Sequence, residues 1–266
     1  MSRLAVVGAG VMGETIIAGL VAGGWEPASI VAVDRYRPRV DEVTGRHGVA
    51  SAATIGEAVA DTDAVLLAVK PQAAAGVLAE IANSIHPRTV LVSICAGIST
   101  ASIEAALPTG TPVVRVMPNT PARVGEGMSA ISAGSAASAA HLDLASAMLG
   151  SVGKVVTVPE TYQDAVTAVS GSGPAYVFYV VEAMVDAGVL LGLPRDVATT
   201  LAVQTLYGTA KLLADSGEHP GRLREQVTSP GGTTAAALRE LDAHGVKAAF
   251  MAAMEACRDR SRELAG

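Results

Sequence analysis

The sequence predicts an α/β fold in which a doubly wound parallel sheet is followed by an all-α region. Short apolar runs with the composition of buried strands alternate with helical segments in the first part of the chain. From about Glu160 onward this alternation stops and long helical stretches replace it. A chain of 266 residues suits two domains. We therefore expect an α/β domain over residues 1–159 and a helical domain over residues 160–266.

Each expected element follows from a local pattern. The strands of the first domain are expected at Leu4–Val7, Ile30–Val33, Ala64–Val69, Val90–Ile94 and Val113–Val116, with a last strand at Lys154–Val158. The long helices of the second domain are expected at Thr161–Leu191, Arg195–Ala214 and Val246–Leu264. Ser170–Pro174 should interrupt the first of these, because proline is tolerated only in the first turn of a helix.

Composition excludes several classes of function. Half of the residues are hydrophobic but only 3% are aromatic, so the core must consist mainly of Ala, Val and Leu. The net charge of −6 and the absence of a basic block argue against nucleic acid as a partner. No export signal and no apolar run of roughly 20 residues is apparent, so we expect a cytoplasmic protein without a membrane span. Cys95 and Cys257 are far apart and indicate neither a disulfide nor a metal site.

The first strand leads into a glycine motif, Gly8-Ala9-Gly10-Val11-Met12-Gly13, followed by an apolar helix. An acidic residue, Asp34, ends the second strand. Strand, glycine turn, helix and acidic strand end together predict a dinucleotide site, whereas the glycine motif alone would be weak. The residues expected to contact the dinucleotide here are Gly8, Gly10, Val11, Met12 and Gly13. Gly8 would make the turn, Gly10 would admit the pyrophosphate and Gly13 would allow close packing.

The end of the second strand leaves the cofactor open. Asp34 suits the ribose 2′-hydroxyl of NAD, whereas Arg35 and Arg37 suit the 2′-phosphate of NADP. The alternative for both arginines is a solvated loop. The arginines favour NADP(H) narrowly, and NAD(H) remains possible.

Three other strand ends supply candidate cofactor contacts, because open α/β sheets bind ligands at the carboxyl ends of their strands. Pro71 keeps Lys70 extended at the first of these ends. Ordinary connecting loops are the alternative at each end. The candidates are Ala68, Val69, Lys70, Pro71, Ala96, Gly97 and Asn119.

The helical half contains a second glycine turn, Ser229-Pro230-Gly231-Gly232-Thr233-Thr234. Gly231 and Gly232 permit positive φ, so successive N–H groups can face one anion just before a helix expected near Ala235. The alternative is that Thr233 or Thr234 only caps that helix.

These motifs together resemble the pyrroline-5-carboxylate reductases, which make proline by reducing a cyclic imine. The resemblance covers essentially the whole chain and includes Ser170–Tyr176 and Ser229–Thr234. It implies an N-terminal Rossmann domain and a C-terminal helical dimerisation domain, giving a homodimer and possibly a decamer. It also implies 1-pyrroline-5-carboxylate as substrate, with its carboxylate on Ser229 and on the backbone of Gly231, Gly232 and Thr233, and with the Thr234 hydroxyl near the ring nitrogen as the catalytic group.

Such a site needs no strong acid, because a cyclic imine can arrive already protonated and the enzyme then supplies proximity and orientation. The sequence bears differently on three alternatives. A hydroxyacid dehydrogenase would need a lysine in the first long helix, and residues 160–210 contain none. A reductase of another cyclic imine carboxylate differs only in pocket shape. A non-catalytic NADP-binding protein would not need the Ser229–Thr234 turn.

Overall fold

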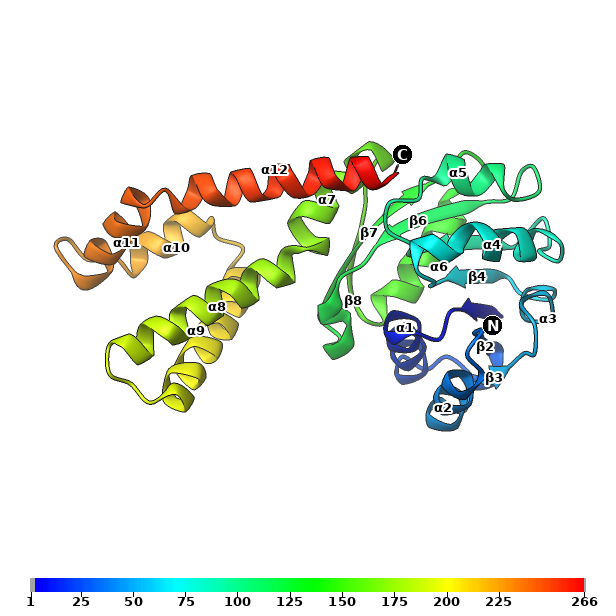
Figure 1. Cartoon of the computed structure of the whole chain (residues 1–266), viewed down its shortest axis with the longest axis horizontal. Coiled ribbons are helices and arrows are strands. Elements are labelled where there is room, and N and C mark those ends of the chain that lie inside the picture. The colour runs from blue at the N-terminus through cyan, green and yellow to red at the C-terminus, as the bar shows by residue number, and fades with distance from the viewer. Residues whose placement is uncertain (1–2, 266) are drawn as a thin grey trace. The chain divides into compact units, whose positions relative to one another are not determined.

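The computed structural model describes residues 3–265, which form two compact units (Figure 1). The first unit runs to Ser172 and also contains the end of the chain from Cys257 onward, and the second comprises Gly173–Ala256. The last strand ends at Thr157, close to the end of the α/β part expected from the sequence. The compact units themselves divide at Ser172, inside the helical stretch that follows.

One eight-stranded sheet in the described residues organises the first unit, with the order β3-β2-β1-β4-β5-β6-β7-β8. The strands are β1 Leu4–Val7, β2 Ile30–Val33, β3 Ala50–Ser51, β4 Ala64–Leu67, β5 Val90–Ser93, β6 Val113–Met117, β7 Gly127–Ala133 and β8 Gly153–Thr157. The strands from β3 to β6 in this order are parallel; β7 pairs antiparallel with β6, and β8 pairs parallel with β7. Because β1 lies between β2 and β4, the strand order reverses beside β1, where such sheets bind ligands.

Helices of the first unit connect these strands. They are α1 Val11–Ala22, α2 Arg37–His47, α3 Ile55–Val59, α4 Pro71–Ala82, α5 Thr100–Ala105 and α6 Ala139–Gly150, and a further helix, α7 Gln163–Val166, follows β8. Short 3-10 turns occur at Pro27–Ser29, Thr120–Val124 and Glu160–Tyr162, and a π-helical turn at Thr167–Gly171. The remaining helices are α8 Gly173–Leu190, α9 Arg195–Ser216, α10 Pro220–Gln226, α11 Thr233–Ala243 and α12 Val246–Ala265.

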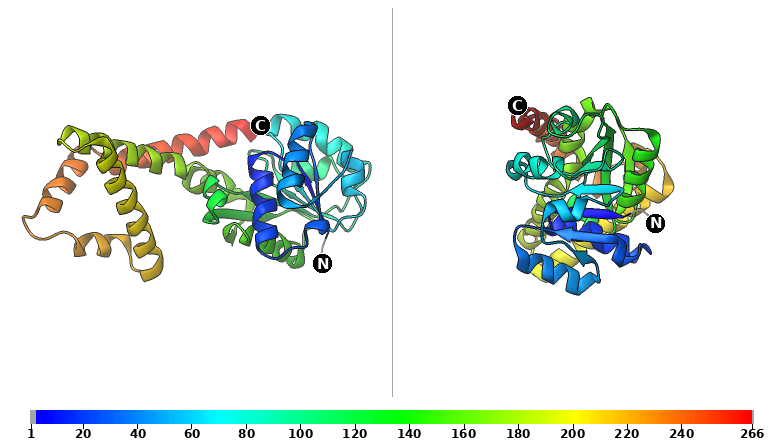
Figure 2. Two further views of the ribbon diagram at one scale, coloured as in Figure 1. Left: turned by 90° about the horizontal axis from the view of Figure 1, so that it is seen from below. Right: turned by 90° about the vertical axis from the view of Figure 1, so that its right-hand side faces the viewer.

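The core of the first unit is split by the sheet into two layers (Figure 2). Along β1, Leu4 and Val6 face one layer, with α1, α2 and α6, whereas Ala5 and Val7 face the other, with α3, α4 and α5. All four residues of β1 are buried, as expected for a parallel strand covered on both faces. The predicted doubly wound fold is therefore confirmed.

Two strands were not predicted from the sequence. β3 is only two residues long, and β7 is Gly-Met-Ser-Ala-Ile-Ser-Ala, in which glycine, serine and alanine have weak strand preference. β7 forms nonetheless because β6 and β8 pair with it on both sides. The expected strands at Leu4–Val7 and Ile30–Val33 have the observed bounds, and the other four differ by one or two residues at their ends.

The second unit contains the α8–α9 hairpin, in which a small core of Val185, Ala198 and Ala202 is buried. Close packing of the two helices depends on Gly188, because a Cβ atom there would lie 2.9 Å from the Cβ of Ala198. Most other apolar side chains of this hairpin are exposed in the single chain, including Phe178 and Tyr179. This exposure leaves a large apolar surface on the second unit.

The sequence expectation that no apolar run is long enough for a membrane span is wrong for one helical run. Glu160–Leu190 is long and apolar enough by length and composition alone, and only 6% of its most apolar stretch is buried in the chain. Within this run the π-helical turn at Thr167–Gly171 and the non-helical Ser172 separate α7 from α8, so the interruption expected at Ser170–Pro174 is present, and Pro174 lies in the first turn of α8, as expected. A single run of this kind is weak support for a span, because helices of non-membrane proteins meet the same two criteria.

Candidate functional site

The glycine motif forms the turn between β1 and α1, and two of its glycines are needed for the fold of the protein, whatever ligand binds there. Gly8 has φ +108°, and a Cβ atom there would lie 2.5 Å from the carbonyl oxygen of Ala68. A Cβ atom on Gly13 would lie 2.1 Å from the carbonyl oxygen of Gly8. The start of α1 therefore packs directly against the backbone of the turn, and a side chain at Gly8 or Gly13 would prevent this packing.

Gly10 differs, because a Cβ atom there would meet nothing within 4 Å. The protein leaves open space beside this backbone, as a site for a closely approaching ligand would. Gly10 is also the N-cap of α1 and offers no side chain to cap it, so the amides of Val11, Met12 and Gly13 have no acceptor in the described chain. Such a helix start favours a phosphate group.

The end of β2 binds back to this turn. Asp34 accepts hydrogen bonds from the backbone N–H of Ala9 at 2.9 Å and of Tyr36 at 3.0 Å. Arg37 is occupied by Asp41 and by Ser51 and the carbonyl of Ala52, so it is part of the packing between α2 and β3. Arg35 is exposed and makes no hydrogen bond within the described residues. Of the two arginines, Arg35 is thus the one available to a ligand at this strand end.

A pocket of about 600 Å³ lies in the first unit at the carboxyl ends of β4 and β5. It brings together three predicted cofactor residues, Pro71, Ala96 and Gly97. Lys70 is extended and is the N-cap of α4, as expected from the proline that follows it. Ala68 and Val69 lie behind the glycine turn, where the Ala68 carbonyl and the Val69 side chain face Gly8.

Several pocket residues were not predicted as site residues. Thr167 and Ser172 come from the π-helical turn and the residue after it, and Cys257, Arg260 and Ser261 come from the end of α12. The thiol of Cys257 lies 3.3 Å from the hydroxyl oxygen of Ser172. The run of small residues at Ser170–Gly173 could have indicated open space there, whereas nothing in the sequence relates the last helix to the strand ends.

Asn119 has a packing role in this structure. Its side chain donates to the carbonyl of Ser170 at 3.1 Å and accepts from the backbone N–H of Met128 at 2.8 Å. These bonds join the end of β6 to β7 and to the π-helical turn. The predicted cofactor contact of Asn119 would have to coexist with both bonds.

The second glycine turn, Ser229–Thr234, belongs to the second unit. Gly231 has φ +68°, and the N–H of Gly232 donates to the carbonyl of Ser229 at 3.0 Å. Helix α11 begins at Thr233, two residues before the expected start, with Gly232 as its N-cap and no side-chain capping bond. The alternative that Thr233 or Thr234 caps this helix is therefore wrong.

This geometry leaves the polar groups of the turn available. The hydroxyls of Ser229, Thr233 and Thr234 make no hydrogen bond within residues 3–265, and the amides of the first turn of α11 have no acceptor there. Donors from a helix start and from three hydroxyls suit a small carboxylate.

Comparison with known proteins identifies the family. A model of the pyrroline-5-carboxylate reductase dimerisation domain matches residues 160–264, and a model described as NADP oxidoreductase, coenzyme F420-dependent, matches residues 3–97. A pyrroline-5-carboxylate reductase from Corynebacterium melassecola is 44% identical, with 99% of each chain covered. One from Pseudomonas aeruginosa is also 44% identical, covering 99% of this chain and 97% of its own. The chain belongs to the pyrroline-5-carboxylate reductase family.

Solved structures of this family agree. The pyrroline-5-carboxylate reductase from Coxiella burnetii has a TM-score of 0.95 at 32% identity and covers 100% of this chain and 99% of its own. The enzyme from Plasmodium falciparum, solved with NADP bound, has a TM-score of 0.87 at 28% identity, with 100% and 98% coverage. The resemblance inferred from the motifs is confirmed, together with the α/β fold, the oxidoreductase class and the NADP(H) type of cofactor.

Proposed function

We propose that this chain reduces the C=N bond of 1-pyrroline-5-carboxylate to give L-proline, the last step of proline biosynthesis. The observation that carries the proposal is similarity to reductases of that name along the full chain, at 44% identity. The Ser229–Thr234 turn supports the same reaction, because its free hydroxyls and amides fit a small carboxylate beside a ring nitrogen.

NADPH, when bound, supplies the hydride that reduces the imine carbon. The amides of Val11, Met12 and Gly13 would bind its pyrophosphate, and Arg35 would pair with its 2′-phosphate. The strand ends Ala68–Pro71 and Ala96–Gly97 would enclose its nicotinamide end, with Asn119 beside them.

On the substrate, Ser229 and the backbone of Gly231, Gly232 and Thr233 would bind the carboxylate. Thr234, the proposed catalytic residue, would place its hydroxyl at the ring nitrogen. The imine arrives as its protonated form, so hydride addition at carbon gives the amine without a strong acid from the protein.

The assembly unit is proposed to be a homodimer through the helical domain, residues 160–266, with residues 1–159 as the cofactor domain. Two observations support it: the dimerisation-domain match over residues 160–264, and the exposed apolar surface of α8 and α9. A decamer is the larger assembly that the family resemblance implies. Light scattering over a range of protein concentrations distinguishes monomer, dimer and decamer.

The proposed location is the cytoplasm, with neither a membrane nor nucleic acid as partner. The net charge of −6 supports the absence of nucleic acid as a partner, because a polyanion would meet a protein of like charge. The two free cysteines also suit a reducing compartment. Fractionation of cells that express the full chain tests the location.

The activity is tested by following loss of reduced nicotinamide absorbance with 1-pyrroline-5-carboxylate. NADPH and NADH are compared, and controls contain either the six-membered cyclic imine carboxylate or no imine. We expect rapid oxidation with the five-membered imine and NADPH. Faster turnover of the six-membered ring would assign a different substrate, and no oxidation with either imine would leave a cofactor-binding protein without this activity.

A further inference from the structure

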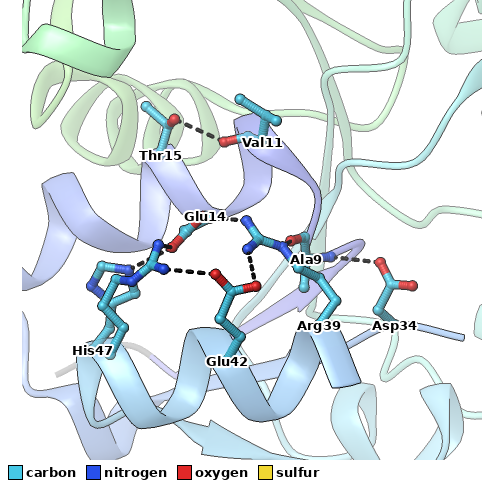
Figure 3. Close-up of polar contacts among 9 residues, drawn as sticks. Ala9, Val11, Glu14, Thr15, Asp34, Arg39, Glu42 and His47 are labelled. Carbon is cyan, nitrogen blue, oxygen red and sulfur yellow. Dashed lines mark hydrogen bonds and ion pairs between the residues drawn. The ribbon is translucent and has the colours of Figure 1, made fainter. Parts of the chain in front are cut away.

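The peptide groups on either side of Ala9, in the middle of the glycine turn, are held by two side chains (Figure 3). The N–H of Ala9 donates to Oδ2 of Asp34 at 2.9 Å, and its carbonyl accepts from Nε of Arg39 at 2.8 Å. Asp34 comes from the end of β2, and Arg39 comes from α2. Ala9 is fully buried, so it can exchange neither bond for water.

Arg39 is itself fixed at the far end of its guanidinium. It forms ion pairs with Glu14, in the first turn of α1, and with Glu42 at 2.6 Å. The side chains of Arg39 and Glu14 are only 23% and 15% exposed. A half-buried, planar fork that contacts one carbonyl and two carboxylates has little freedom to move. The Ala9 carbonyl is therefore tied to two helices at once.

Arg46 offers an internal comparison, because it forms ion pairs with the same two acids, Glu14 and Glu42. It does not contact the glycine turn in the described structure, and its side chain is more exposed than that of Arg39. Both arginines thus pair with Glu14 and Glu42, but in the described structure only Arg39 also donates a hydrogen bond to the carbonyl of Ala9.

Fixing the Ala9 carbonyl fixes the plane of the peptide that joins Ala9 to Gly10. Gly10, with open space beside it, and the unpaired amides of the first turn of α1 come immediately after this peptide in the chain. We propose that Arg39 is a positioning residue for the cofactor: together with Asp34 it holds the turn so that these amides face the pyrophosphate. This inference rests on the proposed function, because it assumes that a dinucleotide binds at the turn.

The test compares Arg39→Met with Arg46→Met in the full chain. Calorimetric titration with NADPH gives the Kd without any imine, and steady-state kinetics gives the KM of each substrate. We expect Arg39→Met to raise the Kd and KM for NADPH roughly tenfold, the effect of losing a hydrogen bond from a charged donor. The kcat at saturating NADPH and the KM for the imine should stay near wild type, as should all constants of Arg46→Met.

Equal weakening of NADPH binding by both variants would assign the effect to the acidic network as a whole and overturn the inference. An unchanged Kd in Arg39→Met would also overturn it. If that variant does not fold, Arg39→Lys decides, because it keeps the positive charge but loses the fork. An unchanged Kd in Arg39→Lys contradicts the proposal, whereas a raised Kd with normal thermal stability supports it. A wild-type chain that does not bind NADPH would instead refute the proposed function, and this inference with it.

Discussion

The carboxylate of Asp34 accepts the backbone N–H of Ala9 at 2.9 Å, which ties the end of β2 to the glycine turn. Its other oxygen accepts the N–H of Tyr36 at 3.0 Å. An acidic residue at this strand end was expected as a ribose ligand, and the structure gives it a second task that does not depend on the identity of the cofactor. The presence of Asp34 is therefore compatible with NADP(H).

Replacing Asp34 by alanine separates these two tasks. Loss of the turn contact should weaken NADPH and NADH alike, by roughly tenfold each for a hydrogen bond to a charged acceptor. Loss of a ribose contact alone would weaken NADH selectively. Titration of Asp34→Ala with each cofactor measures the difference, and Asp34→Asn, which keeps one acceptor oxygen, should lie between the variant and wild type.

Alanine at Gly10 and at Gly13 should give different defects. Gly10→Ala should fold with near-normal thermal stability, because its Cβ atom meets nothing within 4 Å, but it should bind NADPH at least roughly tenfold more weakly. Gly13→Ala should unfold at lower temperature, since its Cβ atom would lie 2.1 Å from the carbonyl oxygen of Gly8. Thermal melts and NADPH titrations check both. Normal NADPH affinity in Gly10→Ala would show that the open space is not the cofactor site.

Arg35 should set the preference between the two cofactors. Arg37 is held by Asp41 and Ser51, whereas Arg35 is exposed and without a hydrogen bond in the described chain. We expect Arg35→Ala to raise the KM for NADPH about tenfold and to change the KM for NADH little, because only NADPH carries the 2′-phosphate. Arg37→Ala is the control and should leave the ratio of the two KM values unchanged. A shifted ratio in the control alone would move the assignment to Arg37.

Local signals predicted much of the fold. The apolar runs at β1 and β2, the glycine turn and the start of α4 at Lys70-Pro71 each result from a few neighbouring residues. β7 could not be predicted, because its glycine, serine and alanine residues form a strand only through pairing on both sides.

The candidate site was predicted where it depends on backbone chemistry and missed where it depends on contacts between distant segments. The turn at Ser229–Thr234 was recognised from its glycines. The bond from Arg39 to Ala9 and the arrival of Cys257 beside Ser172 join segments far apart in the sequence, and neither has a periodic pattern that predicts it. Asn119 was predicted as a cofactor contact, whereas in the structure its side chain bonds to the carbonyl of Ser170 and the N–H of Met128.

Glu160 should make stability depend on acid pH. It accepts bonds from the Thr100 backbone at 2.8 Å and from Arg115 at 3.1 Å. Burial works to raise its pKa, but the hydrogen bonds from Thr100 and Arg115 outweigh burial and hold the pKa below its ordinary value of 4.5. Ionised Glu160 therefore stabilises the folded state above that value, and this contribution is lost as pH falls through the lowered pKa.

Urea denaturation of Glu160→Gln at neutral and acid pH measures this contribution. At neutral pH the variant should be less stable than wild type by about 1–3 kcal/mol. The difference should shrink as the pH falls from the ordinary value to below the lowered pKa, because the unfolded wild-type chain binds a proton at Glu160 first and the folded protein then follows. Glu80→Gln, at an exposed position of α4, is the matched control and should show no such trend. A difference that is constant with pH would contradict the assigned cause.

Two hydroxyls of the second glycine turn should affect different kinetic constants, that of Ser229 the KM for the imine and that of Thr234 the kcat. Ser229→Ala removes a proposed carboxylate ligand, so the KM for the imine should rise roughly tenfold with little change in kcat. Thr234→Ala removes the proposed hydrogen bond at the ring nitrogen, which strengthens as the amine forms, so kcat should fall roughly ten- to hundredfold. Steady-state kinetics at saturating NADPH measures both.

Thr228→Ala is the matched control, because the Thr228 hydroxyl already donates to the carbonyl of Arg224 at 2.6 Å and points back into α10. Wild-type kinetics in both Ser229→Ala and Thr234→Ala would move the substrate site away from this turn, whereas equal losses in all three variants would indicate that the turn itself has been disordered.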